Sequence, residues 1–262
     1  MANVKISAVI ITLNEERNLP RALATLEPVA DEVVIVDSGS TDGTREIAER
    51  AGARFIAHAW EGYAAQKNFV ASQAQYDWVL SLDADEALSP ELAAEIERLK
   101  QTAPGDATGF TMPRRARFRG RWIRHSGWYP DPKLRLYDRR RCRWVGQYVH
   151  EHVETDGPVR KLAGNLLHYP ADSREEQLRS VDRYTTLAAR QALEDGERLI
   201  ILKLLIFPGW KFVETYLFRL GFLDGSAGFM IARMAGHYIC QKYEKLWRMA
   251  RAAKSEMESA GH

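Results

Sequence analysis

Two carboxylates separated by one residue are the feature of this sequence that most directly indicates chemistry. Asp83 and Asp85 come directly after an apolar segment at residues 78–82, which is typical of a buried strand. Carboxylate oxygens are the ligands that Mg²⁺ and Mn²⁺ prefer, and these ions keep coordination positions open for the phosphates of a substrate. Because an Asp-x-Asp occurs by chance in many loops, its place at the end of a strand gives it weight.

Polar side chains also follow two earlier strand-like segments. Residues 6–11 and 33–36 are apolar runs rich in β-branched residues, and Asn14 and Asp37 follow them. Helix-like segments cover residues 15–26, 40–50, 64–72 and 89–100, and a further short strand covers 54–57. Ser40 or Thr41 is the predicted cap of the second helix, and Ser89, followed by Pro90, is the predicted cap of the fourth. This order predicts βαβ units and a mostly parallel sheet with flanking helices. Ligands bind at the carboxyl ends of such strands, so we expect Asn14, Asp37 and Asp83 to converge on one crevice.

The pattern changes after residue 101. Short strands are predicted at residues 109–117, 133–138 and 143–150, followed by a helix over 174–194. The segment from residue 199 onward is rich in Leu, Ile, Phe and Tyr, but charged residues interrupt it before an apolar run of about 20 residues is reached. Basic residues among aromatics fit helices that lie in a membrane interface. A hydrophobic hairpin packed on the main domain, or on a second copy in a homodimer, explains the same pattern.

The composition excludes several classes of protein. A charged content of 27% excludes a membrane-embedded bundle, and a formal net charge of +2 gives no reason to expect a nucleic-acid partner. The two cysteines, Cys142 and Cys240, form no metal-ligand pattern and suit a reducing compartment. The first residues lack the features of a signal peptide. We therefore expect a cytoplasmic protein.

Arginines are concentrated in two stretches, at residues 114–124 and 139–143. Such clusters can bind phosphate groups of an acidic substrate or of a lipid. A solvated face whose charges are paired with acids is the alternative interpretation. The sequence leaves both interpretations open.

Three sequence blocks resemble the family 2 glycosyltransferases, whose nucleotide-binding fold is called GT-A. The blocks are Ile-Ile-Thr-Leu-Asn-Glu-Glu at 10–16, Val-Asp-Ser-Gly-Ser-Thr-Asp-Gly-Thr at 36–44, and Leu-Asp-Ala-Asp-Glu at 82–86. Residues 66–68, 127–131, 149–151 and 221–225 resemble a subgroup of lipopolysaccharide-core glucosyltransferases. The resemblance implies an α/β GT-A catalytic domain over residues 1–170. Its nucleotide-binding half would be 1–101 and its acceptor half 102–170, followed by a helical, membrane-associating region at 171–262.

The resemblance also implies roles in a nucleotide-sugar site. Thr12, Asn14 and Glu15 would hold the nucleoside, and Asp37 would hydrogen-bond the uracil or ribose; a turn-forming Asp is the alternative for Asp37. Asp83 and Ala84 would contact the donor, with Asp83 on the ribose or metal, and Asp85 would bind the metal that bridges the diphosphate. Lys67 would support the nucleotide, unless it is an exposed helix lysine. His168 would complete the metal shell, although a lone His is often structural.

The attacking hydroxyl loses a proton, so the reaction needs a general base, and the resemblance implies that a carboxylate of the acceptor half supplies it. Glu151, in Val-His-Glu-His at 149–152, is the predicted base, and Asp131 is its competitor. The Glu-Asp pair common in the family's base motif is absent, and His150-Glu151 stands in its place. Trp128 and Tyr129, with Arg124, are predicted to bind the acceptor, and core packing is the alternative for the aromatics.

These residues together predict an inverting, metal-dependent hexosyltransferase that uses Mg²⁺ or Mn²⁺. The resemblance implies UDP-glucose as donor and a lipopolysaccharide-core or related glycolipid as acceptor, on the cytoplasmic face of the inner membrane. Other donors or acceptors, and a non-catalytic nucleotide-sugar-binding protein at the membrane surface, are the alternatives. An aspartyl-phosphate phosphatase is disfavoured because Ala87 stands where a hydroxyl residue is needed, and the glycine motifs of dinucleotide and P-loop enzymes are absent.

Overall fold

The computed structural model describes residues 4–146, 151–170 and 174–260, and the side chains of all of these except 174–180 and 254–260. The chain forms two compact units. The first contains residues 1–116 and 130–169, and the second contains residues 117–129 and 170–262. The functional boundary predicted at residue 170 remains a prediction.

A mixed β-sheet is the centre of the first unit. Its strands lie in the order β3 (Arg54–Ala57), β2 (Glu32–Asp37), β1 (Ile6–Thr12), β4 (Trp78–Asp83), β8 (Asp131–Asp138), β6 (Gly109–Phe118), β12 (Leu166–His168) and β5 (Glu86–Leu88). The first four strands are parallel, β8 is antiparallel to both β4 and β6, and β5 is antiparallel to β12. β11 (Val159–Lys161) runs parallel to β6, and β9 (Cys142–Val145) pairs with β10 (His152–Thr155). The predicted α/β fold is confirmed; the sheet is parallel from β3 to β4, as predicted, and mixed beyond β4.

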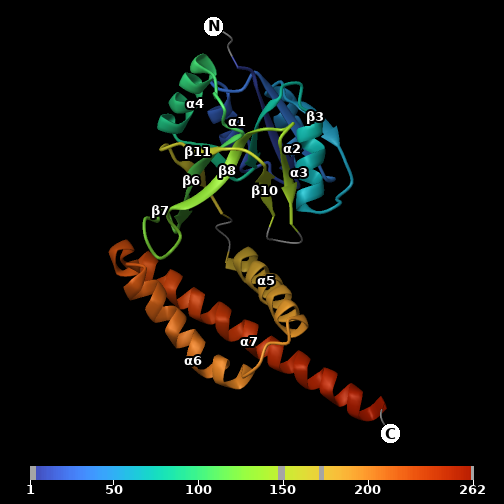
Figure 1. The fold of residues 1–262 in the computed structure, drawn as a ribbon, viewed down its shortest axis with the longest axis vertical. Coiled ribbons are helices and arrows are strands. Elements are labelled where there is room, and N and C mark those ends of the chain that lie inside the picture. The colour runs from blue at the N-terminus through green and yellow to red at the C-terminus, as the bar shows by residue number, and fades with distance from the viewer. Residues whose placement is uncertain (1–3, 147–150, 171–173, 261–262) are drawn as a thin grey trace. The chain divides into compact units, whose positions relative to one another are not determined.

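Helices cover both faces of this sheet, as expected for strands that are apolar on both sides. Ile6, Ala8 and Ile10 of β1 pack in one cluster with α1 (Leu19–Leu26), α2 (Thr44–Arg50) and α4 (Pro90–Thr102). Val9 lies on the opposite face, in a cluster with α3 (Tyr63–Ser72). Figure 1 shows the helices around the sheet. Ser89 caps α4 as predicted, because its hydroxyl accepts a hydrogen bond from the backbone N–H of Leu92.

Two helices begin later than predicted, and both differences lie in loops at the carboxyl ends of strands. α1 begins at Leu19 because residues 15–18 form a turn after Asn14, whose φ is +56°. α2 begins at Thr44, where Asp42 accepts hydrogen bonds from the Thr44 backbone and hydroxyl. The predicted caps at Ser40 and Thr41 are wrong, since both residues bond to the neighbouring loop instead.

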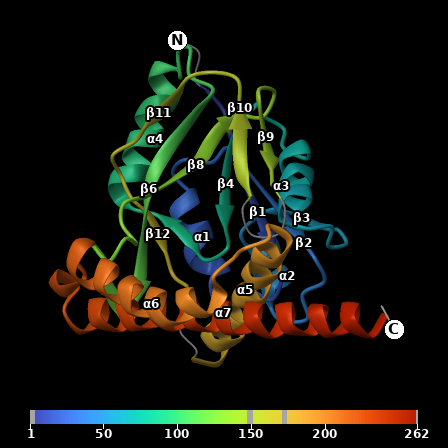
Figure 2. The ribbon, with the colours of Figure 1, turned by 60° about the horizontal axis from the view of Figure 1, so that its bottom comes forward.

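The second unit is mainly helical. β7 (Arg121–Trp122) pairs with Arg117 and Phe118 at the end of β6, and α5 (Arg174–Glu194) confirms the predicted helix at 174–194. α6 (Ile200–Val213) continues into a π-helical turn (Glu214–Phe218), a 3-10 turn (Gly221–Asp224) and α7 (Ser226–Ala260). α6 and α7 lie side by side in Figures 1 and 2. In the described part of the chain, no helix has the length and apolarity needed to cross a membrane.

Candidate functional site

The loops that follow β1 and β2 are joined by hydrogen bonds. The backbone N–H of Asn14 donates to Ser40 Oγ at 2.7 Å, and Asn14 Oδ1 accepts from the backbone N–H of Thr41 at 2.8 Å. Two residues after Asn14, the Glu16 carboxylate accepts a hydrogen bond from the backbone N–H of Gly43 at 2.8 Å. These cross-links explain the left-handed conformation of Asn14, which Asn tolerates better than most residues. The structure thus brings two of the three predicted strand ends together.

Asp37 is buried at the end of β2, where it organises its own loop. Its carboxylate accepts from Thr12 Oγ1 at 2.8 Å and from the backbone N–H groups of Gly39 and Ser40 at 2.9 and 2.7 Å. Burial alone would raise the pKa of Asp37, but hydrogen bonds from Ser40, Thr12 and Gly39 outweigh it and lower the pKa. The turn-forming role is therefore present. Contacts of Thr12 and Asp37 with a nucleoside stay a prediction.

The Asp-x-Asp turn is shaped by the strand that follows it. Glu86 Oε2 accepts from the backbone N–H of Asp83 at 3.1 Å, while Ala84 is buried within the turn. β12 pairs with β5, and this pairing sets His168 Nε2 3.1 Å from Asp85 Oδ2. The backbone N–H of the next residue, Tyr169, donates to the Asp85 carbonyl at 2.9 Å. A lone histidine far along the sequence is therefore beside the second carboxylate of the motif.

The pKa of Glu15 links the first loop to this turn. Burial is the largest cause of the raised pKa of Glu15. The hydrogen bond that Asn18 donates to the Glu15 carboxylate opposes this rise, and the negative charges of Asp85, Asp42 and Asp83 raise the pKa further. Carboxylates act on one another in this way only over short distances. The loop after β1 and the turn after β4 therefore share one electronegative region at the carboxyl ends of the strands.

Asp85 and His168 fit a divalent cation better than Asp83 does. Their side chains are partly exposed, at 28% and 19%, and present one carboxylate and one imidazole nitrogen together. Both oxygens of Asp83 are already engaged by cations, Oδ1 by Lys67 and Oδ2 by Arg135. Within the described residues there is no cluster of three His, Cys, Asp or Glu side chains suited to a metal. Phosphate oxygens of a substrate would have to complete the coordination.

Alternating charges, fully buried at Lys67, Arg135 and Glu86 and half-buried elsewhere, connect the Asp-x-Asp turn to the second half of the sheet. We call this series the charge chain; its members are Glu151, Lys67, Asp83, Arg135, Glu86, Arg114, Asp131 and Lys133. Its central contact is between Arg135 and Glu86, at 2.7 Å, and both side chains are almost fully buried. Burial of Asp83 would raise its pKa, but Arg135 and Lys67 hold it well below its usual range. The carboxylate therefore stays ionised and fixed.

Lys67 is the member of the charge chain that faces both halves of the first unit. It is 2% exposed on α3, so the alternative of an exposed helix lysine is wrong. Its Nζ lies 2.8 Å from Asp83 Oδ1 and 3.7 Å from Glu151 Oε1, and 4.3 Å from the centroid of the Trp144 ring. The cation–π contact and the two carboxylates together compensate its burial.

The residues before and after Lys67 connect α3 by hydrogen bonds to two other parts of the first unit. Gln66 donates from Nε2 to Ser38 Oγ at 3.0 Å, in the loop after β2. Asn68 exchanges two hydrogen bonds with the backbone of Trp144 in β9, at 2.8 and 2.9 Å. Figure 2 shows α3 beside β9. The Gln-Lys-Asn sequence thus connects the loop after β2, the Asp-x-Asp turn and β9.

The two candidate bases have different surroundings. Both oxygens of Asp131 are ion-paired, with Arg114 at 2.7 Å and Lys133 at 3.0 Å. Glu151 has Lys67 near Oε1, but its buried Oε2 has no hydrogen-bond partner among the residues that the structure describes. A buried acceptor without a donor costs about 1–3 kcal/mol. Oε2 of Glu151 therefore has an unused acceptor position, whereas both oxygens of Asp131 are paired with cations.

Some predicted residues fall outside this cluster or outside the described residues. Arg124, Trp128 and Tyr129 belong to the second unit. There Trp128 packs edge-on against Phe118, with ring centroids 5.6 Å apart, in agreement with the core-packing alternative. Their acceptor-binding role stays a prediction. The motif residues Val149 and His150, and the last part of the strand predicted at 143–150, lie outside the described residues.

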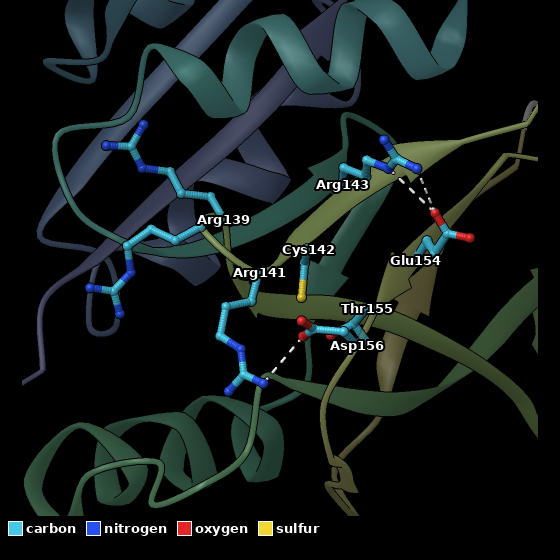
Figure 3. Close-up of a pocket in the computed structure, with 8 residues that line it drawn as sticks. Arg139, Arg141, Cys142, Arg143, Glu154, Thr155 and Asp156 are labelled. Carbon is cyan, nitrogen blue, oxygen red and sulfur yellow. Dashed lines mark hydrogen bonds and ion pairs between the residues drawn. The ribbon is translucent and has the colours of Figure 1, made fainter.

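The arginine cluster at 139–143 begins at the other end of β4 from the Asp-x-Asp turn and ends within β9. Asp138, which precedes the cluster, pairs with Trp78 at the start of β4, whereas Asp83 ends that strand. Arg141 pairs with Asp156 at 3.2 Å and Arg143 with Glu154 at 3.0 Å, as Figure 3 shows. This part of the chain therefore matches the interpretation of a solvated face with paired charges.

Sequence reasoning missed three residues of the site: Arg135, Glu86 and Trp144. Glu86 belongs to the Leu-Asp-Ala-Asp-Glu block, but its side chain had no assigned role. Arg135 stands between Leu134 and Leu136 in a strand, and a cation in such an alternating apolar segment is a signal that a buried acid lies opposite. Trp144 carried no signal beyond its residue type.

Comparison with known proteins gives consistent matches. The sequence profile of Glycosyl transferase family 2 matches residues 7–153. The chain is 35% identical over 264 residues to the lipopolysaccharide core biosynthesis glycosyltransferase LpsC of Rhizobium meliloti, covering 97% of each. It is 31% identical over 236 residues to an uncharacterized glycosyltransferase of Rickettsia typhi, covering 86% of this chain and 81% of that protein.

Solved structures match over smaller parts. S. aureus TarS matches with a TM-score of 0.44 and 18% identity, over 72% of this chain and 40% of TarS. Glucosyl-3-phosphoglycerate synthase from Mycobacterium tuberculosis, in complex with Mn²⁺, UDP and glucosyl-3-phosphoglycerate, matches with a TM-score of 0.36 and 23% identity. That match covers 43% of this chain and 44% of the synthase.

Proposed function

This chain belongs to glycosyl transferase family 2 and has the GT-A fold, and from this premise we propose that it transfers glucose from UDP-glucose to a sugar of a lipopolysaccharide-core or related glycolipid. The similarity to LpsC over nearly the whole chain supports this class of acceptor. The observation that carries the catalytic part of the proposal is the buried Oε2 of Glu151, which has no hydrogen-bond partner in the described part of the chain and lies two ion pairs away from the Asp-x-Asp turn.

In the proposed reaction, the acceptor hydroxyl attacks the anomeric carbon of the donor. The bond between that carbon and the diphosphate oxygen breaks, and the electron pair leaves with UDP. Glu151 Oε2 accepts the hydroxyl proton, a contribution worth about 10²–10⁴-fold in rate. A single displacement of this kind inverts the anomeric configuration.

Asp85 and His168 would hold the Mg²⁺ or Mn²⁺ ion. When bound, this ion offsets the negative charge that develops on the diphosphate. Lys67 and Arg135 keep Asp83 ionised and fixed, so that the Asp83 carboxylate can accept hydrogen bonds from the ribose. Thr12, Asn14, Glu15 and Asp37 would surround the nucleoside. Preorganised charges of this kind need no rearrangement during the reaction.

A lipid-anchored acceptor also implies a place at the membrane. We propose that the protein acts peripherally on the cytoplasmic face of the inner membrane, with the second unit as its contact. The exposed apolar side chains of α6, including Leu205 and Trp210, support this. A homodimer that covers the same side chains remains the alternative.

The test is UDP release with a panel of UDP-sugars, Mn²⁺ and a truncated lipopolysaccharide-core acceptor, together with calorimetric titration of UDP. We expect UDP-glucose to be the best donor, and Asp85→Asn to abolish metal-dependent UDP binding. NMR of the product should show the inverted anomer. The absence of UDP binding with any metal would overturn the uridine donor. UDP binding without turnover on any acceptor would favour the non-catalytic alternative.

A further inference from the structure

An exposed surface of the second unit combines arginines with large apolar side chains. We call residues 117–129 the arginine loop and residues 217–223 the apolar tip. We infer that these two segments form one docking surface for a bilayer that contains anionic lipids. The inference deepens the proposed function, because it identifies which part of the second unit contacts the membrane and which lipid chemistry it recognises.

The arginine loop and the apolar tip are held together by polar contacts. The backbone N–H of Ser126 donates to the Arg219 carbonyl at 2.8 Å. The buried Asp224 carboxylate accepts from the backbone N–H groups of Arg124 and His125 at 3.1 and 2.9 Å, and from Ser126 Oγ at 3.2 Å. The sequence Gly-Phe-Leu-Asp-Gly at 221–225 thereby fixes the loop to the tip.

Close backbone contact makes this connection tight. A Cβ atom on Gly228 would lie 1.8 Å from the carbonyl oxygen of Gly221, so the first turn of α7 can approach the tip only without a side chain there. Phe118, Ile123, Ala227 and Ile231 form a small apolar core beneath the loop. The two segments therefore present their outward side chains as one rigid surface.

The positive charges on this surface are not neutralised locally. Arg117, Arg119, Arg121 and Arg124 are exposed, and none forms an ion pair with a side chain that the structure describes. The Asp224 carboxylate is turned inward to the backbone of the loop. The acidic neighbour of Arg219, which is Glu214, also pairs with Lys211. The surface therefore carries a net positive charge that a phosphate-bearing partner would complement.

The apolar tip exposes large side chains beside these arginines. Leu217, Phe218, Leu220, Phe222 and Leu223 are 52%, 67%, 44%, 45% and 56% exposed. Contiguous apolar side chains exposed to this degree mark an interaction site. A bilayer surface supplies anionic phosphates and hydrocarbon in adjacent layers, and interfacial elements bind it by combining basic and apolar side chains. A neutral apolar protein partner would leave the arginines without counter-charges.

The test is sedimentation of the full chain with vesicles of phosphatidylcholine alone, or of phosphatidylcholine with about 30% of an anionic lipid. We expect binding only to anionic vesicles, weakened by added salt. Arg117→Ser with Arg121→Ser should weaken binding about tenfold or more, since each basic residue contributes about 1 kcal/mol near such a surface. Phe218→Ser with Leu223→Ser should also release the protein. The matched control, Arg141→Ser with Arg143→Ser in the paired cluster, should bind like the wild type.

Several outcomes would overturn the docking surface. These are equal binding to neutral vesicles, insensitivity of wild-type binding to salt, or an equal loss in the control variant. A dimer in solution that Phe218→Ser with Leu223→Ser dissolves would assign the tip to a second copy instead. Transfer to a truncated, lipid-free acceptor is measured in parallel. Transfer without vesicle binding would refute membrane docking and leave the proposed transfer reaction standing, whereas vesicle binding without transfer would refute the proposed reaction and leave the docking surface standing.

Discussion

Two sets of ion pairs in the first unit use the same side-chain types in different surroundings. The charge chain lies around the Asp-x-Asp turn, where the side chains of Lys67, Arg135 and Glu86 are 3%, 4% and 0% exposed. The pairs of the 139–143 cluster lie at the surface, on and beside β9 and β10, where the side chains of Arg143 and Glu154 are 74% and 55% exposed. Sequence alone presents the second set as the more conspicuous concentration of charge.

The difference in burial determines what each set can do. Removing a charged group from water costs several kcal/mol, which is recovered only if its partners remain in place. Exposed pairs contribute about 0–1 kcal/mol, because water and salt screen them. A protein that buries alternating charges next to a turn of carboxylates fixes their positions before a charged substrate arrives. We therefore expect substitutions in the charge chain to have large effects and those in the exposed cluster to have small ones.

The largest effect is expected for Glu151, the proposed base at the end of the charge chain. Glu151→Gln keeps the shape of the side chain but cannot accept a proton, so kcat should fall about 10²–10⁴-fold while UDP affinity stays within about twofold. Asp131→Asn should reduce kcat less, because Asp131 is already neutralised by Arg114 and Lys133. The measurement is steady-state UDP release together with calorimetric titration of UDP. A larger fall in Asp131→Asn would transfer the role of base to Asp131.

The second-largest effect is expected on stability, for Arg135 and Glu86 at the centre of the charge chain. Arg135→Met should lower the free energy of unfolding by about 3–5 kcal/mol, because it removes the nearest cation from the fully buried Glu86. Adding Glu86→Gln should restore part of the loss, since no uncompensated carboxylate then remains. Urea denaturation of the two single variants and the double variant measures this coupling. Additive losses would show that the two side chains stabilise the fold independently.

A smaller, pH-dependent effect is expected at Glu15. Burial and the nearby carboxylates of Asp85, Asp42 and Asp83 raise its pKa, despite the hydrogen bond from Asn18. The folded protein thus holds this proton more tightly than the unfolded chain, so stability decreases as the pH rises from the ordinary glutamate range to the raised pKa. Glu15→Gln removes that decrease.

In metal-free buffer, the melting temperature of Glu15→Gln relative to the wild type should therefore be higher at pH 7 than at pH 4. Glu27→Gln, at an exposed position beyond α1, is the control and should show no such trend. A constant difference between Glu15→Gln and the wild type at all pH values would mean that the carboxylates do not share one electronegative region.

The strands and the positions of their polar ends were predictable from the sequence because they follow local rules. Apolar, β-branched runs such as residues 6–11 and 33–36 can be buried on both faces, and the residues after them must lie at the sheet edge. The cap at Ser89 was also predictable, because Ser-Pro carries both its hydrogen-bond acceptor and its fixed first turn. Asn14, Asp37 and Asp83 could therefore be placed before the fold was known.

The burial of Lys67 and Arg135 could not be predicted, because it depends on contacts distant in the sequence. Arg135 reaches Asp83 only because β8 pairs with β4, across 52 positions. Lys67 is covered by Trp144, which α3 holds through Asn68. The late start of α1 has the same origin, since the loop after β1 bonds to the loop after β2 instead of beginning a helix. Such pairings follow from strand register, which the residue pattern alone leaves open.

The smallest effect is expected in the exposed cluster. A double-mutant cycle of Arg143→Met and Glu154→Gln should give a coupling free energy below about 1 kcal/mol. This coupling should disappear in about 1 M salt, where the screening length is about 3 Å. Neither variant should change kcat or the affinity for UDP, because both side chains are exposed and pair with each other on the surface of β9 and β10. A clear loss of acceptor affinity in Arg143→Met would assign these arginines to a phosphorylated acceptor. The acceptor would then have to extend from the Asp-x-Asp turn to the surface of β9 and β10, and burial would no longer separate functional charges from solvated ones in this protein.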